Sequence, residues 1–175
     1  SQSRFFKPRF TYSWDWCPRL VPVGVGGPLR LLTGSSARVC LRRVAADFDH
    51  HTGLGTVEAA LDGAEAAVRT RLRLLDGGRE IAATETAPLR LEALKVNPWR
   101  PNLHGAPKTY TAEITAWDAA GEECLRETRT VGFRRVEWKP CEGAPDGAAP
   151  WLCVVNGEPV FLGGANWVPA RLAHL

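Results

Sequence analysis

Apolar and polar side chains alternate one by one along the middle of the chain, from Ala37 to about Phe133. The alternation comes in short runs bounded by turn residues, and no run carries helix caps around a 3.6-residue period. Successive side chains of a strand point to opposite faces of a sheet, so this pattern predicts strands with one dry face and one wet face. The sequence therefore predicts an all-β fold.

Three runs show the alternation most clearly, and one of them carries three alternate arginines. These arginines can form a basic stripe for an anionic partner or the solvated face of a strand, and we favour the solvated face. In the first run, Val39 and Leu41 face away from Arg38 and Arg42. In the second, Val57, Ala59 and Leu61 face away from Glu58. In the third, Val68, Leu72 and Leu74 face away from Arg69, Arg71 and Arg73.

The segment from Val57 to Val68 is rich in Ala, Glu and Leu and favours a helix by propensity alone. Asp62-Gly63 separates two alternating runs within it, as a tight turn does, so we predict two strands. Further turn residues at 76–78 and 119–121 give about seven strands in about 100 residues, which is typical of an immunoglobulin-like sandwich. The Cys, Trp and Cys spacing of antibody domains is not evident.

Two loops interrupt or follow the alternating region. Asn97–Pro107 is rich in proline and contains His104, which we interpret as a surface or turn histidine because no second ligand stands at metal-binding spacing. The low-complexity stretch Pro140–Pro150 predicts an exposed loop.

A new pattern begins after this loop. Leu152–Leu162 predicts a hairpin with Asn156-Gly157 at its turn, and 163–169 read Gly-Gly-Ala-Asn-Trp-Val-Pro. Glycines after an apolar strand let a ligand approach the backbone, and Asn166 and Trp167 supply an amide and an indole beside it. An ordinary turn with a packing indole is the alternative.

Near the start of the chain, Trp14 and Trp16 flank Asp15, and Pro18 follows. An indole offers a flat apolar face to the C–H side of a pyranose, and an ionised carboxylate accepts hydrogen bonds from sugar hydroxyls. The group therefore suits a sugar-binding site. The alternative is that both indoles belong to a core and Asp15 caps a turn.

Composition narrows the class of protein. The 175 residues are 45% hydrophobic and 23% charged, a composition typical of a globular protein. The charged residues that give the net charge of +3 are scattered without a basic run, so no nucleic-acid partner is expected. Five cysteines without C-x-x-C spacing argue against a disulfide framework or a zinc knuckle and are expected to be mostly free and buried.

The sequence was also searched for a membrane span and a secretory signal. No apolar run approaches the length of a membrane span, so no membrane association is expected, and Phe5-Phe6-Lys7-Pro8-Arg9 is not a secretory signal. The sequence starts at Ser1 and lacks methionine, from which we expect an excerpt of a longer protein.

Four groups of residues together resemble glycoside hydrolase family 2, in its β-mannosidase branch. The Trp-Asp-Trp group indicates the mannosidase branch, and the others resemble the family in general. They are Trp14-Asp15-Trp16 with Pro18-Arg19-Leu20, Pro98-Trp99 with Pro101-Asn102 and Gly105, Val131-Gly132-Phe133-Arg134, and Asn156-Gly157 with Pro159-Val160-Phe161 and Gly164-Ala165-Asn166-Trp167-Val168-Pro169.

The resemblance implies a domain order. Residues 1–35 would end a sugar-binding jelly roll, 36–135 would form the immunoglobulin-like sandwich, and 136–175 would be a linker and the first strand of a (β/α)₈ barrel. The chain departs from the family at Ser13 and Cys17, where glycine is usual, and at Gly26-Gly27, where a bulky Trp-bearing turn is usual.

The resemblance also implies a site. Asp15 would reach into the mouth of the barrel to bind sugar hydroxyls with Trp14 or Trp16 beside it, and Asn166 and Trp167 would line the same pocket. No metal or organic cofactor is implied. The implied partners are a β-mannoside or related oligosaccharide and the remaining jelly-roll and barrel domains of the same protein.

A retaining glycosidase needs two carboxyl groups about 5 Å apart, one as nucleophile and one as acid/base. In the family both are glutamates on later barrel strands, the acid/base after an asparagine, and this chain contains no Asn-Glu dipeptide. The resemblance therefore implies a fragment of a retaining exo-acting β-mannosidase-like enzyme that is inactive by itself. A non-catalytic carbohydrate-binding or spacer module and a family-2 enzyme acting on glucosaminides or N-glycan mannosides remain alternatives.

Overall fold

The computed structural model describes residues 39–165 and, before them, residues 24, 25, 27, 29 and 31. The chain divides into two units, one of residues 32–162 and one of residues 1–31 together with 163–175. The described residues of the second of these units are exposed and lie outside regular strands. Within the described part of the chain, no helix is long and apolar enough to cross a membrane.

The first sheet of the larger unit has three antiparallel strands in the order β1-β2-β5. Phe48, Val57, Leu91 and Leu94 bury their side chains on one face of this sheet, as the alternation predicts. The strands are β1 (Cys40–Asp49), β2 (Leu54–Asp62) and β5 (Arg90–Leu94).

The second sheet has four antiparallel strands in the order β4-β3-β6-β7. Gly77 and Gly78, with φ of 55° and 87°, form the tight turn between β3 and β4 that the sequence predicts. Gly121, with φ of 81°, closes the predicted turn between β6 and β7. The strands are β3 (Arg69–Asp76), β4 (Arg79–Thr84), β6 (Tyr110–Trp117) and β7 (Glu123–Val131).

One hydrophobic core joins these two sheets. Leu72 and Ile114 of the second sheet and Val57 of the first are fully buried in the same cluster. Phe133, which follows β7, is 0% exposed and meets the edge of the Tyr110 ring at a centroid distance of 5.3 Å. The prediction of an all-β, immunoglobulin-like sandwich of seven strands is confirmed.

Tyr110 stands at the start of β6 and ties the sandwich to the loop before it. Its hydroxyl oxygen accepts a hydrogen bond of 2.8 Å from the backbone N–H of Asn97. A tyrosine at this place whose hydroxyl bonds to upstream backbone is a hallmark of immunoglobulin-like sandwiches. The hydrogen bond anchors the beginning of the Asn97–Pro107 loop to the core.

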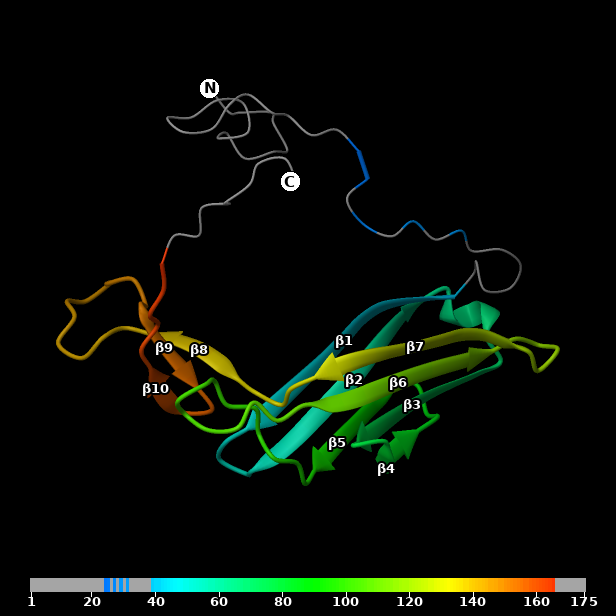
Figure 1. Ribbon diagram of the computed structural model, residues 1–175, viewed down its shortest axis with the longest axis horizontal. Helices are drawn as coiled ribbons and strands as arrows, with labels where there is room; N and C mark the ends of the chain where they lie inside the picture. The colour runs from blue at the N-terminus through cyan, green and yellow to red at the C-terminus, as the bar shows by residue number, and fades with distance from the viewer. Residues whose placement is uncertain (1–23, 26, 28, 30, 32–38, 166–175) are drawn as a thin grey trace. The chain divides into compact units, whose positions relative to one another are not determined.

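A third sheet in the order β10-β9-β8 follows the sandwich and lies at the end where β1 turns into β2 (Figure 1). Asn156 and Gly157, with φ of 52° and 83°, form the predicted tight turn of its hairpin. Pro159 stands on the edge strand, where a missing N–H costs no ladder hydrogen bond. The strands are β8 (Val136–Lys139), β9 (Leu152–Val155) and β10 (Glu158–Val160).

The connection from β2 to β3 is longer than the predicted tight turn. Gly63 takes a left-handed φ of 70°, and a 3₁₀ turn, η3 (Ala64–Ala66), follows before β3 begins in the other sheet. β2 and β3 confirm two strands here, but the predicted tight turn between them is wrong, because η3 separates them and β3 belongs to the other sheet. The expected burial of Val68 is also wrong, since its side chain is 67% exposed. β3 begins only at Arg69, so Val68 belongs to the connection and not to the sheet.

The three alternate arginines of β3 are matched by partners within their own sheet. Arg73 binds Glu80 and Glu113 at 2.6 and 2.7 Å, and the Arg71 guanidinium lies 3.4 Å from Glu80. The remaining guanidinium, that of Arg69, lies over the Trp117 ring. These contacts favour the interpretation of the three arginines as the solvated face of a strand, and not as a basic stripe for an anionic partner.

The remaining local predictions can be compared with the described residues. His104 is exposed at a turn of the Asn97–Pro107 loop, and 140–150 form an exposed loop, both as predicted. Four of the five cysteines are described, and all four are free, but only Cys124 and Cys153 are buried.

Candidate functional site

The five residues predicted to bind sugar lie outside the described residues. They are Trp14, Asp15, Trp16, Asn166 and Trp167. The structure therefore leaves the predicted sugar site as a prediction. The other groups of residues that carry the family resemblance lie mostly within the described part, and three of them meet at one place.

We call this place the joint and define it by Trp99, Gly132, Arg134, Arg135 and Asn156. Trp99 belongs to the Asn97–Pro107 loop, Gly132 to Arg135 connect β7 to β8, and Asn156 begins the β9–β10 turn. The joint therefore connects the sandwich to the β8–β10 sheet.

Asn156 is the hydrogen-bonding centre of the joint. It is 6% exposed, and its Oδ1 accepts a hydrogen bond of 2.9 Å from the backbone N–H of Arg135. Its Nδ2 donates a hydrogen bond of 3.0 Å to the carbonyl oxygen of Trp99. Its own backbone N–H donates to the carbonyl oxygen of Arg135 at 2.9 Å. One side chain thus binds the backbone of two segments that are distant in sequence.

Trp99 fills the space between the sandwich and the third sheet. Its backbone N–H donates a hydrogen bond of 2.8 Å to the carbonyl oxygen of Phe133. A Cβ atom on Gly132 would lie 3.0 Å from three side-chain atoms of Trp99, so a larger residue at this position would have to displace the indole by a few tenths of an ångström. The Arg134 guanidinium lies 4.7 Å from the centre of the Trp99 ring. The indole also packs against the buried side chains of Cys153, Val155 and Val160.

Two ion pairs flank the joint. Arg135 binds Asp47 of β1 through two hydrogen bonds, one of which joins Nε to Oδ1 at 3.1 Å. This hydrogen bonding holds the pKa of Asp47 below its usual range, against the opposite effect of partial burial. Arg100 Nη1 lies 2.8 Å from Glu158 Oε1 at the start of β10, and this contact lowers the pKa of Glu158.

The hairpin turn also contacts the β1–β2 turn directly. A Cβ atom on Gly157 would lie 2.5 Å from Cδ2 of His50, and φ of 83° at Gly157 is left-handed. Glycine is therefore required at this position for both its backbone conformation and its close neighbour.

The Asp47–Arg135 pair predicts a pH dependence of stability. A carboxyl whose pKa is lowered by folding stabilises the protein above its unfolded pKa of about 3.9, and this contribution is lost as the pH falls through the lower folded value. We expect Asp47→Asn to cost about 0.2–1 kcal/mol at pH 7, the range for exposed ion pairs, and less at acid pH. Urea unfolding of both proteins at pH 7 and pH 3 measures the change.

The control for this experiment is Asp146→Asn, which makes the same chemical change in the exposed 140–150 loop. It should alter the free energy of unfolding little at either pH. A difference between wild type and Asp47→Asn that is equal at pH 7 and pH 3 would contradict the lowered pKa.

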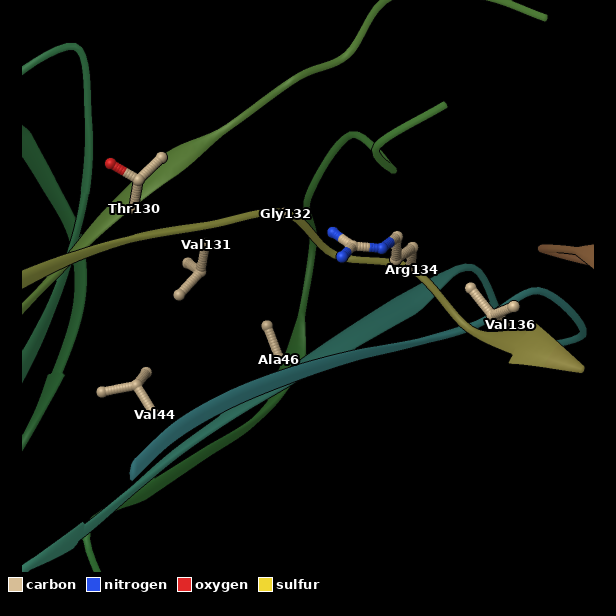
Figure 2. A pocket seen from close by; sticks show the side chains of 7 residues that line it. All are labelled: Val44, Ala46, Thr130, Val131, Gly132, Arg134 and Val136. Carbon is tan, nitrogen blue, oxygen red and sulfur yellow. The ribbon is translucent and has the colours of Figure 1, made fainter. Parts of the chain in front are cut away.

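A small hollow of about 290 Å³ opens beside the joint, between β1 and the chain that leaves β7. Figure 2 shows Ala46 of β1 and Val131 pointing toward one another, with Arg134 farther along the connection. The described residues that line the hollow are mostly apolar, and none carries a carboxylate. This lining lacks the paired carboxyl groups that glycoside hydrolysis needs.

The arrangement of the joint is structural in character. Asn156 uses both ends of its side-chain amide on backbone groups, and the Arg135 and Asp47 side chains bind each other. Sequence patterns identified Trp99 and Asn156, but Arg135 and Asp47 have no motif of their own. Asp47 lies within the alternating region, and that pattern does not reveal a partner.

Comparisons with known proteins find similarity to glycosidases. No family model matches the sequence. A β-mannosidase B from Aspergillus terreus is 27% identical over 173 residues, which cover 94% of this chain and 20% of the relative. The β-mannosidase of Capra hircus is 23% identical over 184 residues, with the same coverage of 94% and 20%. The chain spans about a fifth of the length of these curated relatives.

Solved structures show the same fold. The β-glucuronidase from Ruminococcus gnavus in complex with D-glucuronic acid matches 72% of this chain and 20% of its own, with a TM-score of 0.52 and 22% identity. At this identity the match supports the sandwich and not a shared substrate. The curated relatives confirm the resemblance to the β-mannosidase branch of glycoside hydrolase family 2.

Proposed function

We propose that this chain is part of a retaining, exo-acting glycoside hydrolase that removes terminal β-linked mannose. The observation that carries the proposal is the match to β-mannosidases along 94% of the chain. Because the match runs nearly the whole length, it extends beyond the sandwich on which the solved structures match. The sandwich by itself would fit many enzymes and binding modules.

The proposed sugar contacts come from both ends of the chain. Asp15 accepts hydrogen bonds from sugar hydroxyls, and Trp14 or Trp16 packs on the apolar face of the ring. Asn166 and Trp167 complete the same pocket. In this proposal residues 1–35 end a jelly roll, 36–135 form the sandwich, and 136–175 begin a barrel.

The proposed reaction proceeds in two steps without a metal or organic cofactor. One glutamate attacks the anomeric carbon while the second protonates the leaving oxygen, and water then releases the sugar with the second glutamate as base. Both glutamates would come from barrel strands of the complete protein. The 175-residue chain would then contribute substrate recognition and no catalytic group.

A panel of aryl β-glycosides tests this proposal on the complete protein. We expect the β-mannoside to be hydrolysed with the highest kcat/KM, and β-mannose to be the first product because the reaction retains configuration. The 175-residue chain should release no aryl alcohol from any member of the panel. The β-glucosaminide, β-glucuronide and β-glucoside serve as competing substrates.

Two of the alternatives have their own results in this panel. A preference for the glucosaminide would indicate the related family-2 activity, and sugar binding without hydrolysis would indicate a carbohydrate-binding module. Hydrolytic activity that co-purifies with the 175-residue chain would contradict the proposal that this chain contributes no catalytic group.

A further inference from the structure

Asn156 and Gly157 form the only Asn-Gly dipeptide in the sequence, and this pair can react with its own backbone. The Gly157 nitrogen attacks Cγ of Asn156, because glycine has no side chain that hinders the approach. The new N–Cγ bond closes a succinimide ring, and Nδ2 leaves as ammonia with the proton of the Gly157 N–H. Water then opens the ring at either carbonyl and leaves aspartate or isoaspartate at position 156.

The two other asparagines of the described part have less reactive neighbours. Asn97 precedes Pro98, whose ring nitrogen carries no N–H to lose. Asn102 precedes Leu103, whose branched side chain hinders the attack. Asn156 is therefore the asparagine of the described part at which this reaction is chemically easiest.

The joint opposes the reaction by holding the Asn156 amide at both ends. Its Oδ1 accepts from the Arg135 N–H at 2.9 Å, and its Nδ2 donates to the Trp99 carbonyl at 3.0 Å. Ring closure makes Cγ tetrahedral, so Oδ1 and Nδ2 leave the plane in which they meet these partners, and the loss of Nδ2 breaks its hydrogen bond outright. The reaction therefore proceeds through a locally opened joint.

We propose that Asn156 is a latent deamidation site, which the closed joint shields and whose reaction releases the β9–β10 hairpin from the sandwich. The aspartate product places an oxygen where Nδ2 donated, opposite the Trp99 carbonyl oxygen, and two acceptors repel. Neither product restores the lost donor, so the release is one-way. The inference is independent of the proposed function.

The isoaspartate product fits the turn even less well. The main chain of isoaspartate runs through the former side chain, which adds one backbone atom to a tight turn whose residues have φ of 52° and 83°. The turn is also confined on its other side, since a Cβ atom on Gly157 would lie 2.5 Å from Cδ2 of His50. The longer turn therefore loses its fit to the β1–β2 turn.

Peptide mapping of the purified protein after incubation in mildly alkaline buffer measures the shielding. We expect aspartate and isoaspartate at position 156 to form about tenfold more slowly, or slower still, in the folded protein than in the same buffer with urea, because two hydrogen bonds of the buried amide have to break first. Equal rates in the folded and the unfolded protein would overturn the proposal.

Trp99→Ala loosens the joint without altering the Asn-Gly pair. The indole packs against the buried side chains of Cys153, Val155 and Val160, on both sides of the turn. We expect the folded variant to deamidate at Asn156 about three- to tenfold faster than the wild type. The matched control is Trp151→Ala, which removes the same side chain at a position that is 78% exposed and should keep the wild-type rate.

Hydrogen exchange in β3 and β6 reports whether Trp99→Ala keeps the sandwich folded. A folded Trp99→Ala that deamidates at the wild-type rate would overturn the joint as the shield. If this variant unfolds, the comparison of folded and urea-unfolded wild type decides the question.

Asn156→Asp supplies the aspartate product directly and tests the release. We expect peptides covering residues 152–162 to exchange hydrogen about tenfold faster in this variant than in the wild type, while peptides of β3 and β6 are unchanged. The matched control is Asn102→Asp, which adds the same charge at an exposed position of the Asn97–Pro107 loop and should leave all these peptides unchanged. Wild-type exchange over residues 152–162 in Asn156→Asp would overturn the release of the hairpin.

Discussion

Replacing Phe133 by alanine should lower the free energy of unfolding of the sandwich by about 3–5 kcal/mol. Phe133 is 0% exposed and belongs to the cluster that joins both sheets. Its ring meets the edge of Tyr110, and its carbonyl oxygen holds the N–H of Trp99. The substitution removes the ring and leaves a cavity that surrounding strands cannot fill without losing register. Urea unfolding followed by circular dichroism measures the loss.

Phe161→Ala is the matched control because the same side chain is removed at a position that is 91% exposed. Its expected effect on the free energy of unfolding lies within about 0.5 kcal/mol. A similar loss in the free energy of unfolding for both variants would mean that Phe133 does not contribute to the core as its burial indicates.

Asp15→Asn in the complete enzyme should reduce kcat/KM for a β-mannoside about 5- to 150-fold or more. This reduction corresponds to a loss of about 1–3 kcal/mol or more of transition-state stabilisation. The substitution keeps the shape of the side chain and removes its charge. A hydrogen bond to an ionised acceptor is about twice as strong as one to a neutral acceptor, so sugar hydroxyls lose their strongest partner. Steady-state kinetics with an aryl β-mannoside measure the reduction, and the melting temperature should stay near that of the wild type.

The control for Asp15 is Asp146→Asn in the exposed 140–150 loop. This variant should keep kcat/KM within about twofold of the wild type, as for a surface change away from the site. A collapse of the melting temperature of Asp15→Asn, with unchanged kinetics of the folded fraction, would identify Asp15 as a structural cap instead.

The strands of the sandwich could be predicted from sequence because their signal is local. A period of two between apolar and polar residues places alternate side chains on one face whatever the partner strand is. The turns at Gly77-Gly78 and Asn156-Gly157 were predictable for a similar reason, since few residue types accept a left-handed φ. Val68 shows the limit, because the alternation begins one residue before β3 begins, and Val68 is exposed.

The joint was only partly predictable. Its residues Trp99, Gly132 and Asn156 belong to groups that resemble a family, but nothing in their spacing says that they meet. Arg135 and Asp47 are 88 residues apart and carry no motif. A charged residue on a strand face is expected whether or not an opposite charge lies near it, so the ion pair could not be predicted from either residue.

The sequence by itself thus determined the alternation of the sandwich strands, the buried face at Val57, Leu72 and Leu74, and the turns at Gly77-Gly78 and Asn156-Gly157. The tertiary structure decided that β1, β2 and β5 form one sheet and β3, β4, β6 and β7 another, and that Trp99, Arg135 and Asn156 lie together. Local patterns depend on neighbouring residues and backbone geometry, which the sequence states directly. Contacts between distant segments depend instead on how all the strands pack around one shared core, and only the folded chain fixes that arrangement.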